Sequence, residues 1–343
     1  MLSVLRDSVR DKIFPGAVAA LISSSDEAYI PFGCETYHAS APPITEESIF
    51  DVASLTKIVA TATAVMQLVE RKQIALHDHA CDFVPHLRRA PKDRITIFQL
   101  LAHTAGFPGG EPLRQYKSRD DLLNAIFSMD LLYPPGTDRV YDDLGYILLG
   151  LIVESITSVT LDEYCASEIF APLEMSETMF VPDKTLLERI VPTEVDAGRG
   201  GLLRGIVHDE TAYKMGGVAG HAGIFTTARD LAKFSRSMMG HDKEALAGIL
   251  SSASVRLMWS RQWQDSQGDY GLGWDRVRPS YMNGIDDPDA VGHTGFTGVS
   301  LVISPRRDLA MILLSNRVHP VRSDRSQIGL ARCRFVEAAL RHW

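Results

Sequence analysis

The sequence contains few cysteines and no extended cluster of basic residues. The four cysteines, Cys34, Cys81, Cys165 and Cys333, lie far apart and form no C-x-x-C pair. This spacing argues against a zinc site and against a disulfide framework. The formal net charge is -8, whereas binding to a phosphate backbone needs a basic face. We therefore expect no nucleic-acid partner.

Long apolar runs are also missing. The uncharged, mostly apolar stretch Ile58–Val69 spans about 12 residues, whereas a helix that crosses a bilayer needs about 20. The first 14 residues scatter charges through an amphipathic pattern. They lack the apolar region and the small-residue cleavage site of a signal peptide. We expect a cytoplasmic protein without a membrane partner.

The chain has 343 residues, of which 45% are hydrophobic, enough for one large domain or two interleaved ones. Apolar patterns predict helices over 1–13, 56–71, 95–103, 144–156, 161–170, 227–239 and 324–342. They predict strands over 17–22, 28–32, 270–274, 299–304 and 309–315. Helices inserted between two halves of one antiparallel sheet give an α/β (α+β) fold.

This order of elements also predicts a domain division. We assign residues 1–60 plus 215–343 to an α/β sheet domain and residues 61–214 to an inserted, mainly helical domain. Residues 192–224 are rich in glycine and charge and predict a long irregular connection. Long ordered loops in enzymes are often binding loops.

The segment that carries the chemistry is Asp51-Val-Ala-Ser54-Leu-Thr-Lys57. Positions i and i+3 share one face of a helix, so Ser54 and Lys57 are expected to meet. Burial and the positive end of a helix both disfavour a charged ammonium, so a neutral Lys57 could take the proton of Ser54. The backbone N–H of Ser54 could donate to an oxyanion. A bare S-x-x-K is more often a surface serine with a solvated lysine, so its context decides the interpretation.

That context is an ordered set of further motifs. Together with the Ser54 segment, the set is Phe50–Lys57, Ile95–Gly106, Tyr141–Gly150 after Pro135-Gly136, Gly220–Gly223 and His293–Gly298. In order and spacing it resembles the class C β-lactamase, penicillin-binding protein and serine esterase superfamily, over nearly the whole chain. The resemblance implies the β-lactamase/transpeptidase fold, an antiparallel sheet flanked by helices with an inserted, mostly helical lobe. It places the active site between the lobes.

Individual roles follow from the same resemblance. Tyr141 matches the family tyrosine, which shares proton transfer with Lys57 and protonates the leaving group; alone, it would be interpreted as a core tyrosine. The backbone N–H of Phe296 matches the second oxyanion donor, beside that of Ser54. Asp143 stands where many relatives have asparagine and is expected to contact Lys57 in the substrate site. A carboxylate there would favour the charged form of the lysine.

His293, Thr294 and Gly295 match the final strand motif K-T-G, with histidine in place of lysine. The lysine supplies a permanent positive charge near a substrate carboxylate, whereas histidine is mostly neutral at pH 7. The exchange favours esters, amides or amino-terminal peptide substrates over β-lactams. Gly295 and Gly298 would let a substrate lie close to the strand. On its own the segment would be interpreted as a strand-edge histidine before a glycine-rich bend.

The remaining histidines are less informative. His103 ends a helix before a glycine turn and is interpreted as structural. His221 could line the pocket, and a packing role is at least as plausible. His77, His79 and Cys81 lie close together, but their spacing fits no zinc motif, so a solvated loop is expected.

These observations predict a serine hydrolase that forms an acyl-enzyme on small ester or amide substrates, with no metal and no organic cofactor. Two alternatives stay open. The first is a true β-lactamase or a D-amino-acid-directed peptidase. The second is a penicillin-binding protein that acylates without turnover. In each case the partner is a small-molecule ester, amide or β-lactam.

Overall fold

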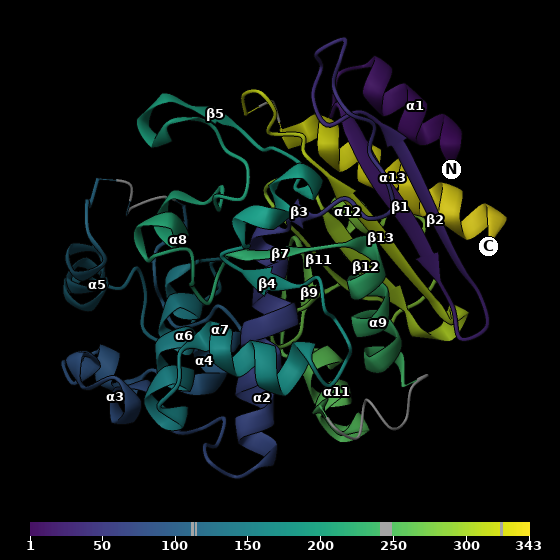
Figure 1. Cartoon of the computed structure of the whole chain (residues 1–343). Coiled ribbons are helices and arrows are strands. Elements are labelled where there is room, and N and C mark those ends of the chain that lie inside the picture. Colours follow the sequence, from purple (N-terminus) through teal and green to yellow (C-terminus); the bar gives the residue numbers. More distant parts are fainter. Residues whose placement is uncertain (111–112, 114, 241–248, 323–324) are drawn as a thin grey trace.

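One eight-stranded antiparallel sheet forms the frame of the structure (Figure 1). The structure is a computed structural model and describes residues 1–110, 113, 115–240, 249–322 and 325–343. Along the sheet the strands are ordered β2-β1-β13-β12-β11-β10-β9-β8. They are β1 Gly16–Ile22, β2 Glu27–Gly33, β8 Trp263–Asp265, β9 Gly268–Tyr270, β10 Asp275–Arg276, β11 Val291–Thr294, β12 Ser300–Ser304 and β13 Leu309–Ser315. The two ends of the chain meet where β1 pairs with β13.

Both faces of this sheet are covered. Every residue of β1 and of β13 is buried, whereas an antiparallel sheet commonly leaves one face in water. Alternate side chains enter two separate cores, as Val18 and Ala20 enter one while Ala17 and Ala19 enter the other. The period of two along the strand produces this division.

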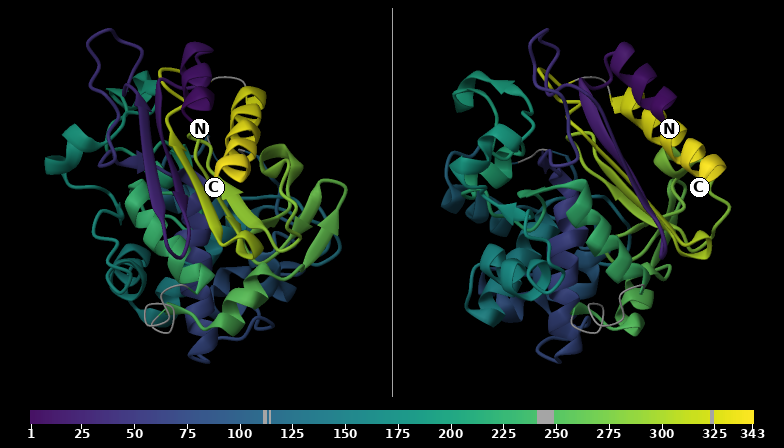
Figure 2. Two further views of the ribbon diagram at one scale, coloured as in Figure 1. Left: turned by 90° about the vertical axis from the view of Figure 1, so that its right-hand side faces the viewer. Right: turned by 45° about the vertical axis from the view of Figure 1, so that its right-hand side comes forward.

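The outer face is covered by helices from the two ends of the chain. These are α1 (Leu2–Arg10), α12 (Pro279–Met282) and α13 (Arg325–His342). Leu5 of α1 and Phe335 of α13 are buried in the outer core. Figure 2 shows α1 and α13 lying side by side against the sheet, with both termini on this side.

The inner face is covered by the helical part of the chain. Its main helices are α2 (Thr63–Glu70), α6 (Leu144–Thr157) and α9 (Ala228–Met239). A π-helical segment, Lys57–Ala62, leads directly into α2. Residues of α2, α6, α9 and the sheet belong to one hydrophobic cluster. Sheet and helices therefore share a continuous core, and the boundaries at residues 60 and 214 stay a prediction.

Shorter elements connect these layers. The shorter helices are α3 Ala80–Phe83, α4 Ile97–Leu101, α5 Arg119–Ser128, α7 Leu161–Cys165, α8 Glu210–Lys214 and α11 Ser252–Trp259. The 3-10 and π-helical turns are Ala53–Leu55, Pro85–Leu87, Lys92–Arg94, Ala166–Phe170, Lys184–Arg189, Ala197–Arg199 and Pro305–Arg307. The small strands are β3 Phe50–Asp51, β4 Met179–Phe180, β5 Val195–Asp196, β6 Gly201–Leu202 and β7 Ile224–Thr226. They pair in the order β3-β7-β4 and as β5-β6.

The structure confirms the predicted fold class and most of the long elements. The helix predicted over 95–103 is limited to α4, because His103 adopts a left-handed conformation with φ +58°. The strand predicted over 270–274 is wrong: β9 ends at Tyr270, and the chain turns at Gly273, where φ is +81°. Residue 324 of the predicted last helix lies outside the described residues. The connection 192–224 is largely irregular but contains β5, β6 and α8.

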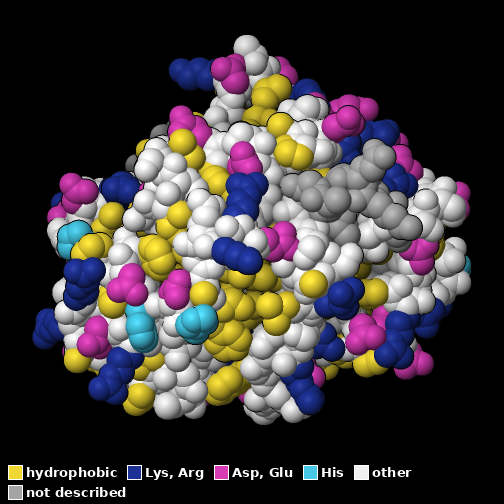
Figure 3. Space-filling model, turned by 90° about the horizontal axis from the view of Figure 1, so that it is seen from below, with side chains coloured by type: hydrophobic (Ala, Val, Ile, Leu, Met, Phe, Trp, Pro, Cys, Tyr) yellow, Lys and Arg dark blue, Asp and Glu magenta, His cyan; other side chains and the backbone are white. Residues whose placement is uncertain are grey.

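Figure 3 shows the end of the molecule seen from below. On the described part of this face, basic and acidic side chains are interspersed, and apolar side chains gather near the middle. Among the described residues, no single helix is long and apolar enough to cross a membrane. Helix α6 and the segment Leu161–Phe170 meet that test only together, as a pair bent by 78°.

Glycine allows α6 to approach the loop that precedes β7. A Cβ atom on Gly220 would lie 2.0 Å from the carbonyl oxygen of Tyr146. A clash with rigid backbone forces the two segments apart, so we expect Gly220→Ala to lower the free energy of unfolding by about 3 kcal/mol. Urea unfolding followed by circular dichroism measures this change.

Gly329 offers the matched control. It lies within α13, and a Cβ atom there would have an ordinary contact, 3.4 Å from the carbonyl oxygen of Ser280. Gly329→Ala should therefore raise the free energy of unfolding by about 0.5–1 kcal/mol. Equal unfolding midpoints for Gly220→Ala and the parent chain would contradict the packing argument.

Candidate active site

Ser54 lies on a strained turn between a strand and a helix. It is the middle residue of the 3-10 turn Ala53–Leu55, directly after β3, and is half-buried. Ala53 has φ +47°, a left-handed conformation that is uncommon for a residue with a Cβ atom. The side chain of Asp51 holds this conformation by accepting the N–H of Ala53 at 2.8 Å. The first N–H groups of a helix have no intrahelical acceptor, so such a turn suits an oxyanion.

Asp51 also fixes the turn to two distant segments. Its second carboxylate oxygen accepts the N–H of His208 at 2.7 Å, and its backbone carbonyl accepts the hydroxyl of Thr297 at 2.7 Å. The side chain is buried. From the sequence, Asp51 was recognised only as part of the Ser54 motif. Its structural role was not predicted, because no local pattern reveals partners 157 and 246 residues away.

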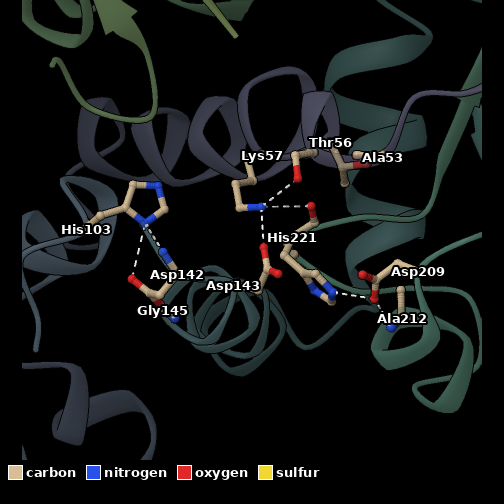
Figure 4. Close-up of polar contacts among 12 residues, drawn as sticks. Ala53, Thr56, Lys57, His103, Asp142, Asp143, Gly145, Asp209, Ala212 and His221 are labelled. Atoms are coloured by element: carbon tan, nitrogen blue, oxygen red, sulfur yellow. Dashed lines mark hydrogen bonds and ion pairs between the residues drawn. The ribbon is translucent and has the colours of Figure 1, made fainter. Parts of the chain in front are cut away.

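Lys57 lies at the centre of the site. Its Nζ atom is 3.0 Å from Oγ of Ser54, 2.6 Å from Oδ1 of Asp143 and 3.3 Å from the carbonyl oxygen of His221. The side chain is fully buried. Figure 4 shows the ammonium pointing toward Asp143 and the His221 carbonyl. The lysine therefore bridges a hydroxyl and a carboxylate.

The sequence left two charge states of Lys57 open, a neutral amine from burial and a charged one from Asp143. Burial by itself lowers the pKa of Lys57, but Asp143 and Tyr141 outweigh burial and raise the pKa above its ordinary value. The ammonium is therefore protonated at neutral pH. In the resting site the effect expected of Asp143 outweighs that expected of burial, because the carboxylate 2.6 Å away stabilises the charged form.

Tyr141 presents its hydroxyl to the same two residues. Nζ of Lys57 lies 4.8 Å from the centre of the phenol ring, and Lys57 and Ser54 both act to lower the pKa of the phenol. Although 40% of the residue's surface is exposed, the desolvation of its hydroxyl raises the pKa of the phenol more than Lys57 lowers it. The phenol is therefore neutral at rest and available as an acid.

Asp142 and His103 support this arrangement from behind. Oδ1 of Asp142 accepts the N–H of Gly145 at 2.6 Å and so caps α6, which leaves the carboxylate of Asp143 to Lys57. Oδ2 of Asp142 lies 3.2 Å from Nδ1 of His103, whose ring centre is 4.7 Å from that of Tyr141. Burial raises the pKa of Asp142 to about 7 and lowers that of His103. His103 packs as the sequence suggested, whereas the role of Asp142 was missed.

The strand β11 brings His293 and the turn after it to the site. The His293 ring is buried, its centre is 6.0 Å from that of Tyr141, and its Nδ1–H donates to the carbonyl of Thr294 at 2.8 Å. Burial lowers the pKa of His293 to about 4, so the ring is neutral at pH 7. A Cβ atom on Gly295 would lie 2.4 Å from the carbonyl oxygen of Val52. That glycine therefore lets the turn approach the backbone beside Ser54.

The loop before β7 supplies a second acid–histidine pair. Nε2 of His221 lies 2.8 Å from Oδ1 of Asp209, and the His221 ring is buried. Asp143, Asp209 and His221 each offer one atom that could bind a metal, and these three atoms lie within 4.8 Å of one another. All three side chains already have partners, because Lys57 donates to Asp143 and His221 pairs with Asp209. The absence of a metal stays a prediction.

The segment around His77 and His79 does not form such a cluster. Both histidines are exposed, and no metal-ligating group is found around them among the described residues. The interpretation of this segment as a solvated loop is therefore right only for the two histidine side chains, since His79 bridges Thr96 and Cys81 is buried in α3. The absence of a metal there stays a prediction.

Comparison with known proteins identifies the family. The sequence profile of the Beta-lactamase family matches residues 3–333. A Salmonella typhi protein named "Putative D-alanyl-D-alanine carboxypeptidase" is 31% identical over 338 residues, which cover 87% of this chain and 76% of that protein.

Solved structures agree on the fold. A class C beta lactamase from Rhodobacter sphaeroides superposes with a TM-score of 0.79 at 18% identity, covering 99% of both chains. The octameric penicillin-binding protein homologue from Pyrococcus abyssi gives a TM-score of 0.77 at 23% identity, covering 99% of this chain and 76% of the other. The chain belongs to the Beta-lactamase family and is a serine hydrolase of that family.

Proposed function

We propose that this serine hydrolase forms an acyl-enzyme at Ser54 and cleaves small ester or amide substrates. The observation that carries the proposal is the position of Lys57, with Nζ 3.0 Å from the Ser54 hydroxyl and 2.6 Å from the Asp143 carboxylate. A nucleophile, a lysine and a carboxylate stand in the same order as in a Ser-His-Asp triad, but here the lysine is charged at rest and must pass a proton to the carboxylate before it can act as a base.

The first step is a coupled proton movement. Lys57 passes one ammonium proton to Asp143 and accepts the proton of Ser54 while Oγ attacks the substrate carbonyl carbon. The carbonyl π electrons move to oxygen, and the backbone N–H groups of Ser54 and Phe296 hold the resulting oxyanion. Because the proton lost by Ser54 stays within the lysine–carboxylate pair, the step releases no proton to solvent.

The tetrahedral intermediate then collapses to the acyl-enzyme. The oxyanion electrons re-form the carbonyl, the bond to the leaving group breaks, and the hydroxyl of Tyr141 protonates the leaving oxygen or nitrogen. Tyr141 recovers a proton from the neighbouring Lys57. In the second half of the reaction, water takes the place of the leaving group and attacks the acyl carbonyl. The bond to Oγ of Ser54 then breaks, Ser54 regains its proton and the acid is released.

The charges around the site support substrates without a carboxylate beside the scissile bond. His293 is neutral, because burial lowers its pKa to about 4. The side chains of Asp143 and Asp209 keep 33% and 30% of their surface exposed. We assign Asp143, His293, Thr294 and Gly295 to substrate binding. A substrate carboxylate would meet no permanent positive charge at His293, which weakens its binding at that position. Asp143 and Asp209 are paired with Lys57 and His221, and the guanidinium groups of Arg317 and Arg322 lie over the ring of Phe296.

A second candidate function is a D-amino-acid-directed carboxypeptidase. It is favoured by the name of the Salmonella typhi protein, with which this chain shares 31% identity. Its substrate carries a terminal carboxylate, so the charge argument speaks against it. Slow acylation without turnover, the behaviour of a penicillin-binding protein, is a third outcome that the same assays detect.

We expect Ser54→Ala to remove catalysis while leaving the fold intact. The assay compares hydrolysis of a p-nitrophenyl ester, a chromogenic cephalosporin and a D-Ala-D-Ala peptide. For the preferred substrate, kcat/KM should fall at least about 10³-fold, as expected for the loss of a nucleophile. The matched control is Ser252→Ala, an exposed serine at the start of α11, which should retain full activity.

The substrates distinguish the three candidates. Ester turnover that exceeds peptide and cephalosporin turnover supports the proposal, and release of D-alanine supports the carboxypeptidase. A stable mass increase on Ser54 without turnover indicates a penicillin-binding protein. Full activity of Ser54→Ala toward all three substrates would overturn the catalytic assignment.

Asp143→Asn tests the proton transfer through the lysine–carboxylate pair. In the parent enzyme, kcat/KM should be flat between about pH 8 and 9, above the range in which Asp142 titrates, because acylation needs no net loss of a proton. Without the carboxylate, the pKa of Lys57 falls. The ammonium must nevertheless release its proton to water before Lys57 can accept the proton of Ser54. We expect kcat/KM at pH 7 to drop about 10- to 100-fold and to rise with pH toward the lowered pKa of Lys57.

The control for this experiment is Asp286→Asn, an exposed carboxylate outside the site. It should leave the whole pH profile unchanged. A parent profile that itself rises through this range, with only a shift to lower pH in Asp143→Asn, would show that Lys57 alone is the base.

A further inference from the structure

Arg332 is a buried cation behind the turn that follows β11. It lies on α13, with only 8% of its surface exposed. Among the described residues, no carboxylate lies within ion-pair distance of its guanidinium. Burial lowers the pKa of Arg332 to about 9, so the side chain stays charged at neutral pH. An unpaired buried charge is costly for stability, and a function of that charge is therefore worth seeking.

The guanidinium holds the two ends of the turn. Nη2 of Arg332 donates to the carbonyl of Gly295 at 2.8 Å and to the carbonyl of Val299 at 2.7 Å. Within the turn, the N–H of Gly295 donates to Val299 and the N–H of Gly298 donates to Gly295. Arg332 thus adds a charged donor to carbonyls that the turn already uses.

One of these carbonyls belongs to the peptide unit that carries the second oxyanion donor. The C=O of Gly295 and the N–H of Phe296 share one planar peptide bond and point in opposite directions. A donor on the oxygen polarises the N–H at the other side of the unit, and a charged donor polarises it more strongly. The low dielectric of a buried site strengthens the effect.

We infer that Arg332 is a positioning residue of the oxyanion hole: through the Gly295–Phe296 peptide, its charge polarises and aims the Phe296 N–H at the developing oxyanion. The inference rests on the proposed function, because it assumes an acyl transfer at Ser54. Arg332 touches neither the substrate nor Ser54 in this role.

Other contacts hold the turn without a charge. The hydroxyl of Thr297 donates to the carbonyl of Asp51, and the hydroxyl of Ser315 donates to the carbonyl of Gly298 at 2.9 Å. These anchors come from β3 and β13, on the two sides of the turn. Loss of the charge at Arg332 therefore leaves the turn attached, and its electrostatic effect can be measured separately.

The test compares Arg332→Gln and Arg332→Lys with Arg334→Gln, an exposed arginine two residues further along α13. Removal of a whole oxyanion donor costs about 10²–10³-fold in kcat, so loss of its polarisation in Arg332→Gln should cost about 10-fold, with KM unchanged. Arg332→Lys keeps the charge with fewer donors and should lie between Arg332→Gln and the parent. Arg334→Gln should match the parent.

An infrared measurement separates polarisation from a structural role. The acyl-enzyme formed from an ester with a 13C-labelled carbonyl is trapped by rapid mixing, and its carbonyl stretch is recorded. A weaker oxyanion hole polarises the acyl carbonyl less, so Arg332→Gln should move the band to higher wavenumber. If Arg332→Gln does not fold, Arg332→Lys should show a smaller shift in the same direction.

The outcomes are distinct. An acyl band and a kcat equal to those of the parent would overturn the role of Arg332. Reduced thermal stability with an unshifted band would also overturn it, because the residue would then serve the fold alone. If the parent enzyme forms no adduct at Ser54, the proposed function fails and this inference fails with it.

Discussion

The buried ammonium of Lys57 is the constraint on which the rest of the site depends. A fully buried charge needs a partner, and its ion-pair partner here is Asp143 at 2.6 Å, with the His221 carbonyl and the Ser54 hydroxyl as further acceptors. Asp143 begins α6, so α6 must approach the segment that carries Lys57. Gly220 permits this approach, since no side chain fits between its Cα atom and the α6 backbone.

Further contacts bring together the two segments that carry the proposed oxyanion donors. Ser54 follows β3, while Phe296 follows β11 of the large sheet. Gly295 allows the carbonyl of Val52 to pack against the start of the turn, and Thr297 donates to Asp51. Because α13 covers the outer face of the same sheet, Arg332 can reach the turn from the side opposite to the substrate. The outer helix layer thus contributes to the site through the backbone.

The sequence predicted the contacts that are local and missed those that are not. Ser54 and Lys57 are three residues apart, so helical spacing alone predicted their contact, and the family resemblance supplied Tyr141. The resemblance also placed Asp143 beside Lys57, but the charge of the lysine depends on a distance of 2.6 Å to that carboxylate, 86 residues away, which no pattern contains. Asp209 and Arg332 were missed for a related reason. Their significance comes from the His221 ring and the Gly295 carbonyl, which only the folded chain brings to them.

The protonation states explain why a carboxylate at position 143 suits this site. Lys57 is charged and Tyr141 is neutral in the resting site. The site therefore holds one proton more than it would hold with a neutral lysine. With asparagine in that position, the excess proton would have to leave for solvent before Ser54 could be activated. In the proposed mechanism Asp143 accepts it within the pair, so the base and the acid are both ready at neutral pH. The substitution that stabilises the charged lysine therefore also provides the route by which that lysine becomes a base.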